Sequence, residues 1–357
     1  MQKKIIALAI AAAVSAPALA DNANVTIYGK AFLNVESVKN DKVVAPNKDN
    51  AMRILNNASR LGVKGSEDVG GGLNAIYQFE VEMDASGLTA AGLGKTRNSG
   101  VGMEGGFGKF IVGIWDTPFK VAHNKIELFD NTTSFTAINL IGKAGNSAAA
   151  AAGGAGANAN YNTRQASMIQ YWTPNFNGVQ AAVSFSPDAA PTTTKDASKL
   201  SMAATYDMDA VYVSAAYESR KDIFAGSTDS GLRFVGKYTM GDFWVGATVE
   251  SIKVNRTATT SFSQKNMELV GQYKLGANKF AISYAKAGKT DVTATGANQL
   301  AVRYGFDFSK RTEFFAAYAS LKNDTAGAYA LSNTYQPTGA ATGSTQTVIG
   351  AGLIHSF

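Results

Sequence analysis

Hydrophobic and polar residues alternate along most of this chain, and the stretch Ser59–Met83 shows the pattern clearly. Leu61 and Val63 fall on one face of this stretch, whereas Arg60 falls on the other. A glycine-rich break, EDVGGG, interrupts the alternation, which then resumes through Met83. A period of two residues is the pattern of a β-strand, and a short glycine-rich break between two such runs predicts a hairpin.

Alternating segments of about ten residues recur from one end of the chain to the other, which is the length that a tilted strand needs to cross a bilayer. Two classes of connection separate them and follow each other strictly, so seven short turns and eight long loops predict sixteen strands. The short turns are Glu67–Gly72, Gly105–Gly108, Pro174–Gly178, Asp207–Asp209, Met240–Asp242, Gly276–Lys279 and Asp307–Arg311. The long loops are Lys39–Met52, Ala85–Lys95, Asp116–Thr163, Pro187–Ser198, Lys221–Ser230, Lys253–Gln264, Lys286–Ala297 and Asn323–Thr345.

Short turns on one side and long loops on the other are typical of an outer-membrane β-barrel. The alternative is a soluble β-sandwich, which has no reason to keep that strict order of connections. Composition does not separate the two, since the mean hydropathy of −0.07 is that of a soluble protein. In a membrane barrel, however, lipid-facing and lumen-facing residues alternate and cancel in any average. We therefore predict an all-β fold, a sixteen-stranded antiparallel transmembrane barrel.

The first twenty residues have the features of a cleaved secretory signal. Lys3 and Lys4 precede the apolar run Ile5–Val14, and Ala18 and Ala20 form a small-residue cleavage site. An N-terminal membrane anchor is the alternative, but the apolar run is too short to span a bilayer. We expect residues 1–20 to be removed and residues 21–357 to form the barrel. The chain has no cysteine, so a secreted protein of this size must be held by backbone pairing or a large core.

Motifs for catalysis or cofactor binding fail on their context. The run Gly100–Gly105 fits G-x-G-x-x-G, but a strand pattern follows it in place of the required helix. The run GLGKT ending at Thr96 lacks the first glycine of a phosphate loop. The chain has two histidines, His123 and His355, which are far apart in the sequence, and no cysteine, so no cluster of metal ligands of these types is present in the sequence. We expect no enzyme activity, no cofactor, no metal site and no nucleic-acid partner; a hydrolase using a serine and His123 is the formal alternative.

Seven segments follow one another over nearly the whole chain after the signal: VTIYGKAFLNVE, SRLGVKGSEDVGGGLNAIYQFE, GGFGKFIVG, TPFK, NTRQASMIQYWTPNFNG, YGFDFSKRTEFFAAYA and GLIHSF. This ordered set resembles the general-diffusion porins of Gram-negative bacteria, in particular the beta-proteobacterial and neisserial branch. The resemblance implies a homotrimer of sixteen-stranded barrels for small hydrophilic solutes and ions, with the third loop, Asp116–Thr163, folded into the pore. It also implies outer-membrane lipid, lipopolysaccharide and the barrel-assembly machinery as partners.

Charged residues on the predicted inner face are the candidate functional residues. Strand alternation places one set on the inner face of their strands, while the apolar neighbours along the same strands lie on the outer face. This set is Lys30, Arg60, Lys64, Glu80, Glu82 and Arg303. In the family that the chain resembles, arginines of the barrel wall face acidic residues of the third loop across the constriction. The resemblance assigns the arginines to Arg60, Arg97 and Arg164, and the acids to Asp116, Glu127 and Asp130.

The balance of these charges predicts a weak preference for anions. Bases and acids nearly cancel, and Ile111, Ile114 and Ile354 stand where basic residues are common in the resembling family. The terminal Phe357 ends an alternating strand and resembles the signal for barrel assembly, the alternative being an aromatic residue at the membrane interface. A substrate-specific channel and a structural or adhesive barrel remain the alternative functions.

Overall fold

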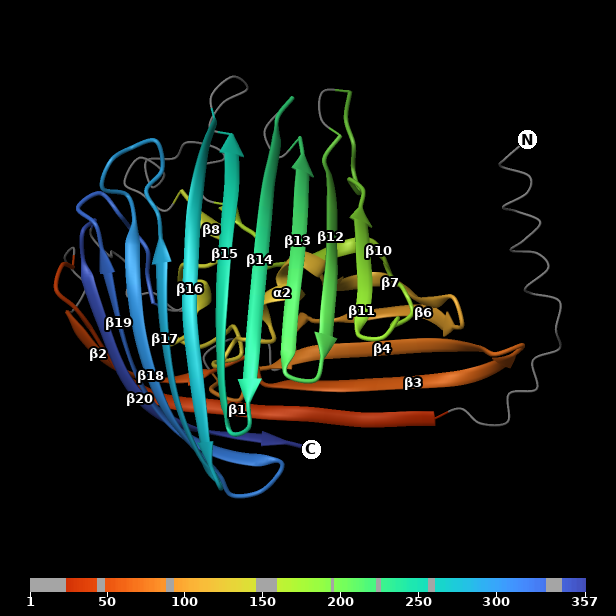
Figure 1. Cartoon of the computed structure of the whole chain (residues 1–357), viewed down its shortest axis with the longest axis horizontal. Helices are drawn as coiled ribbons and strands as arrows, with labels where there is room; N and C mark the ends of the chain where they lie inside the picture. Colours follow the sequence, from red (N-terminus) through yellow and green to blue (C-terminus); the bar gives the residue numbers. More distant parts are fainter. Residues whose placement is uncertain are drawn as a thin grey trace.

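The computed structural model describes residues 24–43, 49–87, 93–145, 159–193, 196–222, 226–255, 261–331 and 342–357. These residues form a closed antiparallel β-barrel of sixteen strands (Figure 1). The predicted fold class and strand number are therefore confirmed. The expected signal segment, residues 1–20, lies outside the described residues. In the part of the chain that the structure describes, no helix combines the length and the apolar character needed to span a membrane.

Fourteen of the sixteen barrel strands are continuous. They are β1 (Asn24–Asn40), β4 (Leu73–Met83), β7 (Gly108–Asp116), β10 (Arg164–Trp172), β11 (Val179–Ser186), β12 (Ser198–Met208), β13 (Val211–Lys221), β14 (Thr228–Met240), β15 (Phe243–Asn255), β16 (Ser261–Leu275), β17 (Asn278–Ala287), β18 (Ala297–Asp307), β19 (Thr312–Asn323) and β20 (Thr345–Ser356). The other two are each built from two pieces, β2 (Asn50–Asn56) with β3 (Arg60–Gly70), and β5 (Leu93–Thr96) with β6 (Ser99–Gly105).

At the break in each interrupted strand, a serine hydroxyl accepts a hydrogen bond from the backbone of the neighbouring strand. Both pieces β2 and β3 pair with β1, and at their junction the Phe32 amide donates to the Ser59 hydroxyl at 2.9 Å. Both pieces β5 and β6 pair with β4, where the Glu80 amide donates to the Ser99 hydroxyl at 2.9 Å. Because ladder bonds are lost at such a break, Arg97 between β5 and β6 is freed from strict alternation.

The first and last strands close the barrel. Strands β1 and β20 pair antiparallel from Lys30 opposite Ser356 to Asn40 opposite Gln346. Backbone hydrogen bonds extend this seam, since the Gly29 amide donates to the Phe357 carbonyl at 2.9 Å. Within the described residues, closure leaves the barrel sheet without an unpaired edge strand, which is the condition for a sheet to span a bilayer.

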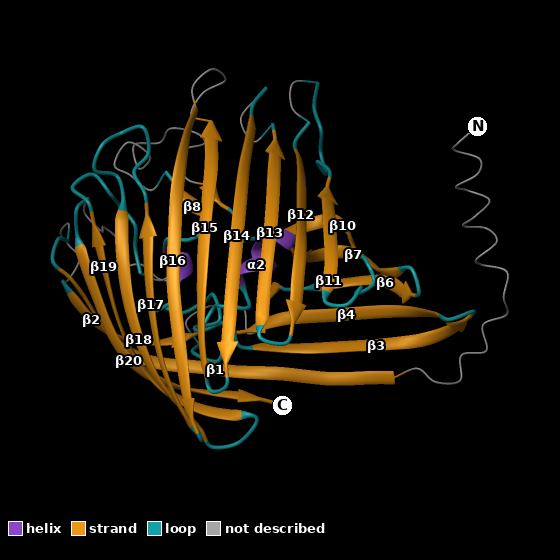
Figure 2. Ribbon diagram, in the orientation of Figure 1, coloured by secondary structure: helices purple, strands orange, loops and turns teal. Residues whose placement is uncertain are grey.

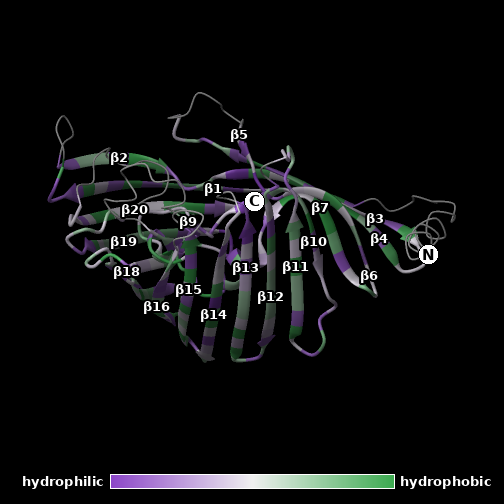
Figure 3. Cartoon of the chain, turned by 90° about the horizontal axis from the view of Figure 1, so that it is seen from above, coloured by the Kyte–Doolittle hydropathy of each residue, from purple (hydrophilic) through white to green (hydrophobic). Residues whose placement is uncertain are grey.

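The two faces of the wall differ as the alternation predicts. Val25, Ile27 and Phe79 project outward and are more than half exposed. Phe32, Asn34 and other residues of the opposite parity project inward and are buried. Viewed from above, hydrophobic and hydrophilic bands alternate along the strands (Figure 3). The apolar exterior and polar interior are those of a barrel that sits in lipid and encloses water.

The predicted order of short turns and long loops is confirmed by the strand order along the chain. The third long loop, here called the pore loop (residues 117–163), carries α2 (Pro118–His123), the 3₁₀ helix η1 (Ala137–Asn139) and the small strands β8 (Lys143–Ala144) and β9 (Ala159–Asn160). Its helical parts lie behind the wall of strands β13–β16, inside the barrel (Figure 2). Most of its alanine-rich run, residues 146–158, lies outside the described residues.

The pore loop is held against the wall by two apolar clusters. In the first, Phe129, Phe135 and Leu140 of the loop pack with Phe32 and Phe315 of the wall. The second cluster packs the other part of the loop on β13–β16 through Phe119, Ala122, Ile126 and Tyr161. A loop this long inside a domain is ordered only if it buries apolar surface. The inward fold of the third loop is therefore confirmed.

Candidate functional site

Buried polar pairs fix the pore loop in addition to its apolar contacts. Arg233 on β14 and Glu250 on β15 lie 2.8 Å apart with fully buried side chains. The guanidinium of Arg233 also donates to the Phe119 carbonyl of the loop at 3.0 Å. Such a buried pair is stable only when its remaining donors are satisfied, and here the loop backbone satisfies one of them.

A second polar anchor lies on the opposite wall. Arg53 on β2 lies 2.6 Å from Glu36 on β1, and the Ser134 hydroxyl of the loop donates to the same carboxylate at 2.8 Å. A third anchor joins His123 at the end of α2 to Glu268 on β16, with Nε2 2.6 Å from the carboxylate. Because these anchors lie on different walls, the loop is braced across the lumen and narrows it.

One group of charges connects the loop to strands β1, β3 and β4. Asp130 of the pore loop forms an ion pair with Lys30 and lies 3.7 Å from Arg60. Arg60 lies 4.0 Å from Glu80, and Glu80 accepts a hydrogen bond from Arg97 at 2.6 Å. Two acids are thus shared among three bases in a continuous chain.

A second group lies at the loop end of strands β7 and β10. Asp116 lies 2.6 Å from Lys120 of α2 and 3.2 Å from Arg164. Asn98 bridges Asp116 and Arg164 within this group, since its amide donates to Asp116 at 3.2 Å while its carbonyl accepts from Arg164 at 2.8 Å. Burial lowers the pKa of Lys120, and nearby Arg164 lowers it further, while the Asp116 carboxylate opposes this shift. One acid therefore faces two bases.

Together these groups form what we call the charge cluster: Lys30, Arg60, Glu80, Arg97, Asp116, Lys120, Asp130 and Arg164. Five bases face three acids, which leaves two positive charges uncompensated. The cluster is only partly buried, so its field acts on the water of the lumen. Charges in a narrow passage with low-dielectric walls act more strongly on an ion than the same charges on an open surface.

Seven of the sequence-predicted site residues belong to the charge cluster. Six lie on the barrel wall, namely Lys30, Arg60, Glu80, Arg97, Asp116 and Arg164, and Asp130 lies on the pore loop. The clearest departure is Glu127, which was expected to face the wall arginines. Its side chain is 4% exposed and lies behind the loop, accepting hydrogen bonds from the Thr136 hydroxyl and the Phe129 amide. Burial raises the pKa of Glu127, and Glu268 adds to this effect while His123 opposes it.

Three further predicted residues form no ion pair with the cluster within the described part of the chain. Lys64 on β3 is exposed, with its ammonium 5.4 Å from the Tyr28 ring. Arg303 on β18 forms an ion pair with Glu313 and stacks near Phe315. Glu82 lies opposite Arg60 in the β3–β4 register and is half-buried.

Sequence reasoning did not identify Lys120 or Asn98. Lys120 lies on a short helix inside the loop, where strand alternation gives no information. Its spacing of four residues from Asp116 is a weak helical signal that was available in the sequence. Asn98 lies in the break between β5 and β6, and its role depends on the approach of β7 and β10.

The motifs that imitate enzyme sites have ordinary structural roles. Gly100 and Gly102 lie within β6 and are paired with β7 on one side and β4 on the other, so no helix follows them. The last four residues of GLGKT form β5. The second ring nitrogen of His123, Nδ1, lies 3.9 Å from Glu127, so both nitrogens face carboxylates and no serine pairs with the ring in the described residues.

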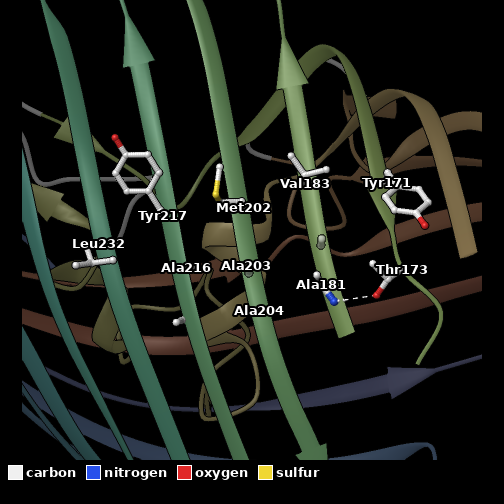
Figure 4. Close-up of a pocket in the computed structure, with 12 residues that line it drawn as sticks. Tyr171, Thr173, Ala181, Val183, Met202, Ala203, Ala204, Ala216, Tyr217 and Leu232 are labelled. Carbon is white, nitrogen blue, oxygen red and sulfur yellow. Dashed lines mark hydrogen bonds between the residues drawn. The ribbon is translucent and has the colours of Figure 1, made fainter. Parts of the chain in front are cut away.

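The outer wall carries a shallow apolar hollow of about 460 Å³ over strands β10–β14. Figure 4 shows small side chains such as Ala204 between the larger side chains of Tyr171, Met202 and Leu232. Its surface is outside the lumen. A hollow of this kind is what alternating small and large lipid-facing residues leave on a barrel wall.

Comparison with known proteins agrees with this architecture. Residues 7–326 match the Gram-negative porin family. Outer membrane porin protein 32 of Delftia acidovorans is 28% identical over the full length of both chains. Major outer membrane protein P.IB of Neisseria sicca is 26% identical over 92% of this chain and 96% of that relative. These names are those of porins and outer membrane proteins and not of enzymes.

Solved structures share the fold. An anion-selective porin from Comamonas acidovorans superposes with a TM-score of 0.78 at 23% identity, covering 94% of this chain and all of the other. OmpT of Vibrio cholerae in its trimer form superposes with a TM-score of 0.60 at 16% identity over 94% of this chain and all of the other. The family match, the sixteen-stranded barrel and the loop folded into its lumen together establish that this chain belongs to the Gram-negative porins of the outer membrane, in their beta-proteobacterial branch.

Proposed function

We propose that the chain forms a homotrimer of water-filled channels that pass small hydrophilic solutes and ions by passive diffusion, with a weak preference for anions. The proposed selectivity rests on the charge cluster, in which the bases outnumber the acids by two. Each acid is shared by two bases, so no acid is free to attract a cation strongly. The selective porin named among the structural relatives has the same preference.

The pore-lining set of this proposal combines the charge cluster with three outlying residues. Lys64 and Arg303 border the lumen away from the cluster and contribute at longer range, where salt screens them. Glu82 lies opposite Arg60 in the β3–β4 register, so its charge offsets part of the positive excess. Glu127 is not part of the set because it is buried behind the loop.

Reconstitution into a planar bilayer of neutral lipid tests both parts of the proposal. We expect steady open channels and a zero-current potential on the anion side in a potassium chloride gradient. The potential should shrink as the mean salt concentration rises, since the Debye length falls from about 10 Å at 0.1 M to about 3 Å at 1 M. Absence of conductance would contradict the channel itself, and a cation-side potential would contradict the charge argument.

The proposed partners follow from the outer surface and the chain end. The apolar exterior fits outer-membrane lipid, including the acyl chains of lipopolysaccharide, and part of it is expected to be buried between subunits of the trimer. Phe357 is proposed as the signal read by the barrel-assembly machinery. In support of this, its side chain is half exposed at the closing seam, and its ring lies over Gly29, which has no side chain there.

A further inference from the structure

A cavity of about 310 Å³ lies between helix α2 of the pore loop and the wall of strands β10–β13. We call it the α2 cavity. It is toward the turn side of the charge cluster, because Arg164 begins β10 whereas Trp172 ends it. Its volume is at the lower limit of small-ligand pockets. The residues that matter below are Gln170, Trp172, Gln180, Asp207, Tyr212 and Lys125.

The walls of the α2 cavity are held in place by hydrogen bonds. The Tyr212 hydroxyl donates to the Ala122 carbonyl at the end of α2 at 2.7 Å. At the other end of the helix, the Phe119 amide donates to the Ser201 hydroxyl of β12 at 3.0 Å. The cavity is thus a preformed space between two braced elements, and a ligand need not order its walls on binding.

Trp172 presents an aromatic surface to this cavity. Trp172 lines both the α2 cavity and a second cavity at the turn side, which it shares with Lys109 and Gln180. The Lys109 ammonium lies 4.4 Å from the ring centre and belongs to the second cavity only. Lys109 therefore contacts the indole from the second cavity, and the Trp115 ring packs edge-to-face with it at a centroid distance of 6.3 Å. The part of the indole that lines the α2 cavity is the surface offered to a ligand.

The polar groups of the α2 cavity combine donors, on Asn124 and Lys125, with three acceptor groups that carry the argument. Gln170 is 1% exposed, and its Oε1 has no hydrogen-bond partner among the described residues. The Gln180 amide already donates to the Thr173 carbonyl at 3.0 Å, which leaves its oxygen as the free end. Asp207 adds a carboxylate at the mouth, 2.5 Å from the ammonium of Lys125. A ligand with several donors fits this set, because an unpaired buried acceptor is unfavourable.

Charge narrows the class of ligand. An anion would meet the Asp207 carboxylate and the carbonyl oxygens of both glutamines. A cation would meet Lys125 at the mouth and Lys109 behind Trp172. A neutral ring that carries hydroxyl groups satisfies both conditions, since hydroxyls donate to the acceptors and a flat C–H face packs on an indole.

We propose that the α2 cavity binds a neutral pyranose sugar, with its ring on Trp172 and a hydroxyl on Gln170. This rests on the proposed function, because the sugar must enter through the open lumen. The site makes the channel weakly saturable for hexoses while leaving ions and other solutes to diffuse. Few contacts and a small cavity set the affinity in the millimolar range.

Saturation-transfer NMR with the detergent-solubilised trimer tests this proposal, with glucose as the probe and sorbitol as the ringless comparison. We expect the glucose ring protons to receive signal that saturates at millimolar concentration, and sorbitol to show none. Trp172→Leu and Gln170→Leu should each raise the half-saturating glucose concentration about tenfold or more. Trp244→Leu is the matched control, since Trp244 faces the lumen beneath Lys237 and does not line the cavity.

Equal signals for glucose and sorbitol, no saturation in the parent protein, or an unchanged response in Trp172→Leu would each overturn the proposal. The same preparations are also reconstituted in bilayers without sugar. Normal ion conductance combined with no glucose binding rejects the sugar site alone. Absence of conductance in the parent protein rejects the proposed channel function instead. Gln170→Leu provides a second cavity variant in case Trp172→Leu does not assemble.

Discussion

Reversing the charge of Arg60 is the most direct test of the charge cluster. The side chain is 21% exposed, and its guanidinium lies 3.7 Å from Asp130 and 4.0 Å from Glu80. The charged groups are farther apart in these contacts than in the pairs Lys30–Asp130 and Arg97–Glu80. Asp130 and Glu80 therefore keep their nearer partners when Arg60 is replaced. Arg60→Glu changes the cluster from an excess of two positive charges to neutrality.

The size of the effect follows from Coulomb's law. One unit charge about 5 Å from a permeating ion contributes about 0.8 kcal/mol in water, and the reversal changes the charge by two units, or about 1.7 kcal/mol. At about 0.1 M salt, screening leaves roughly 1 kcal/mol. The free energy of a cation in the pore falls by as much as that of an anion rises, so the difference between them changes by about 2 kcal/mol. The anion-to-cation permeability ratio therefore falls about 30-fold. At about 1 M salt the same estimate gives only about 3-fold.

The assay is the zero-current potential of the reconstituted channel in potassium chloride gradients at low and high mean concentration. We expect Arg60→Glu to move the potential toward the cation side at low salt, with Arg60→Gln about halfway. Arg311→Glu is the matched control, because Arg311 lies on the exposed turn after β18. An unchanged potential for Arg60→Glu, or an equal shift for Arg311→Glu, would refute the placement of Arg60 in the conducting path.

Three further predictions concern pH, the pore loop and assembly. Burial lowers the pKa of Lys120 from its ordinary value of 10.5, so this lysine should lose its charge as the pH rises toward 10.5 and before it reaches that value. The anion preference should decline over the same rise in pH, and Lys120→Arg should remove this part of the decline. His123→Leu leaves the buried Glu268 carboxyl without its partner, so the loop should lose about 3–5 kcal/mol of docking stability and become sensitive to protease. Deletion of Phe357 should lower the yield of trimer in outer membranes, whereas Phe176→Ala, which removes another exposed aromatic ring, should not.

Each of these has a result that would contradict it. Identical pH profiles of selectivity for the parent protein and Lys120→Arg would exclude a lowered pKa at the cluster. The double variant His123→Leu/Glu268→Leu should recover most of the protease resistance, since the buried carboxyl of Glu268 is then removed together with its partner. Failure to recover would show that the histidine matters for packing alone. Normal trimer levels without Phe357 would make it an interfacial aromatic residue only.

The sequence alone determined the wall of this protein. Alternation is a local property with a period of two, so it identifies both the strands and the face to which Lys30, Arg60 and Glu80 belong. The strict order of short and long connections then decided the strand number. The inward fold of the third loop came from the resemblance to porins and not from any periodicity in the loop itself.

Only the tertiary structure decided which charges meet. The side of a strand on which a residue lies says nothing about its height relative to residues on other strands or on the pore loop. Arg97 lies in a strand break, and Lys120, Glu127 and Asp130 lie in a loop without strand periodicity. Glu127 and Asp130 are three residues apart and both carry a carboxyl group, yet one is buried beside His123 while the other faces Lys30. That difference comes from the way the loop packs its phenylalanines against the wall, which depends on contacts between residues far apart in the chain.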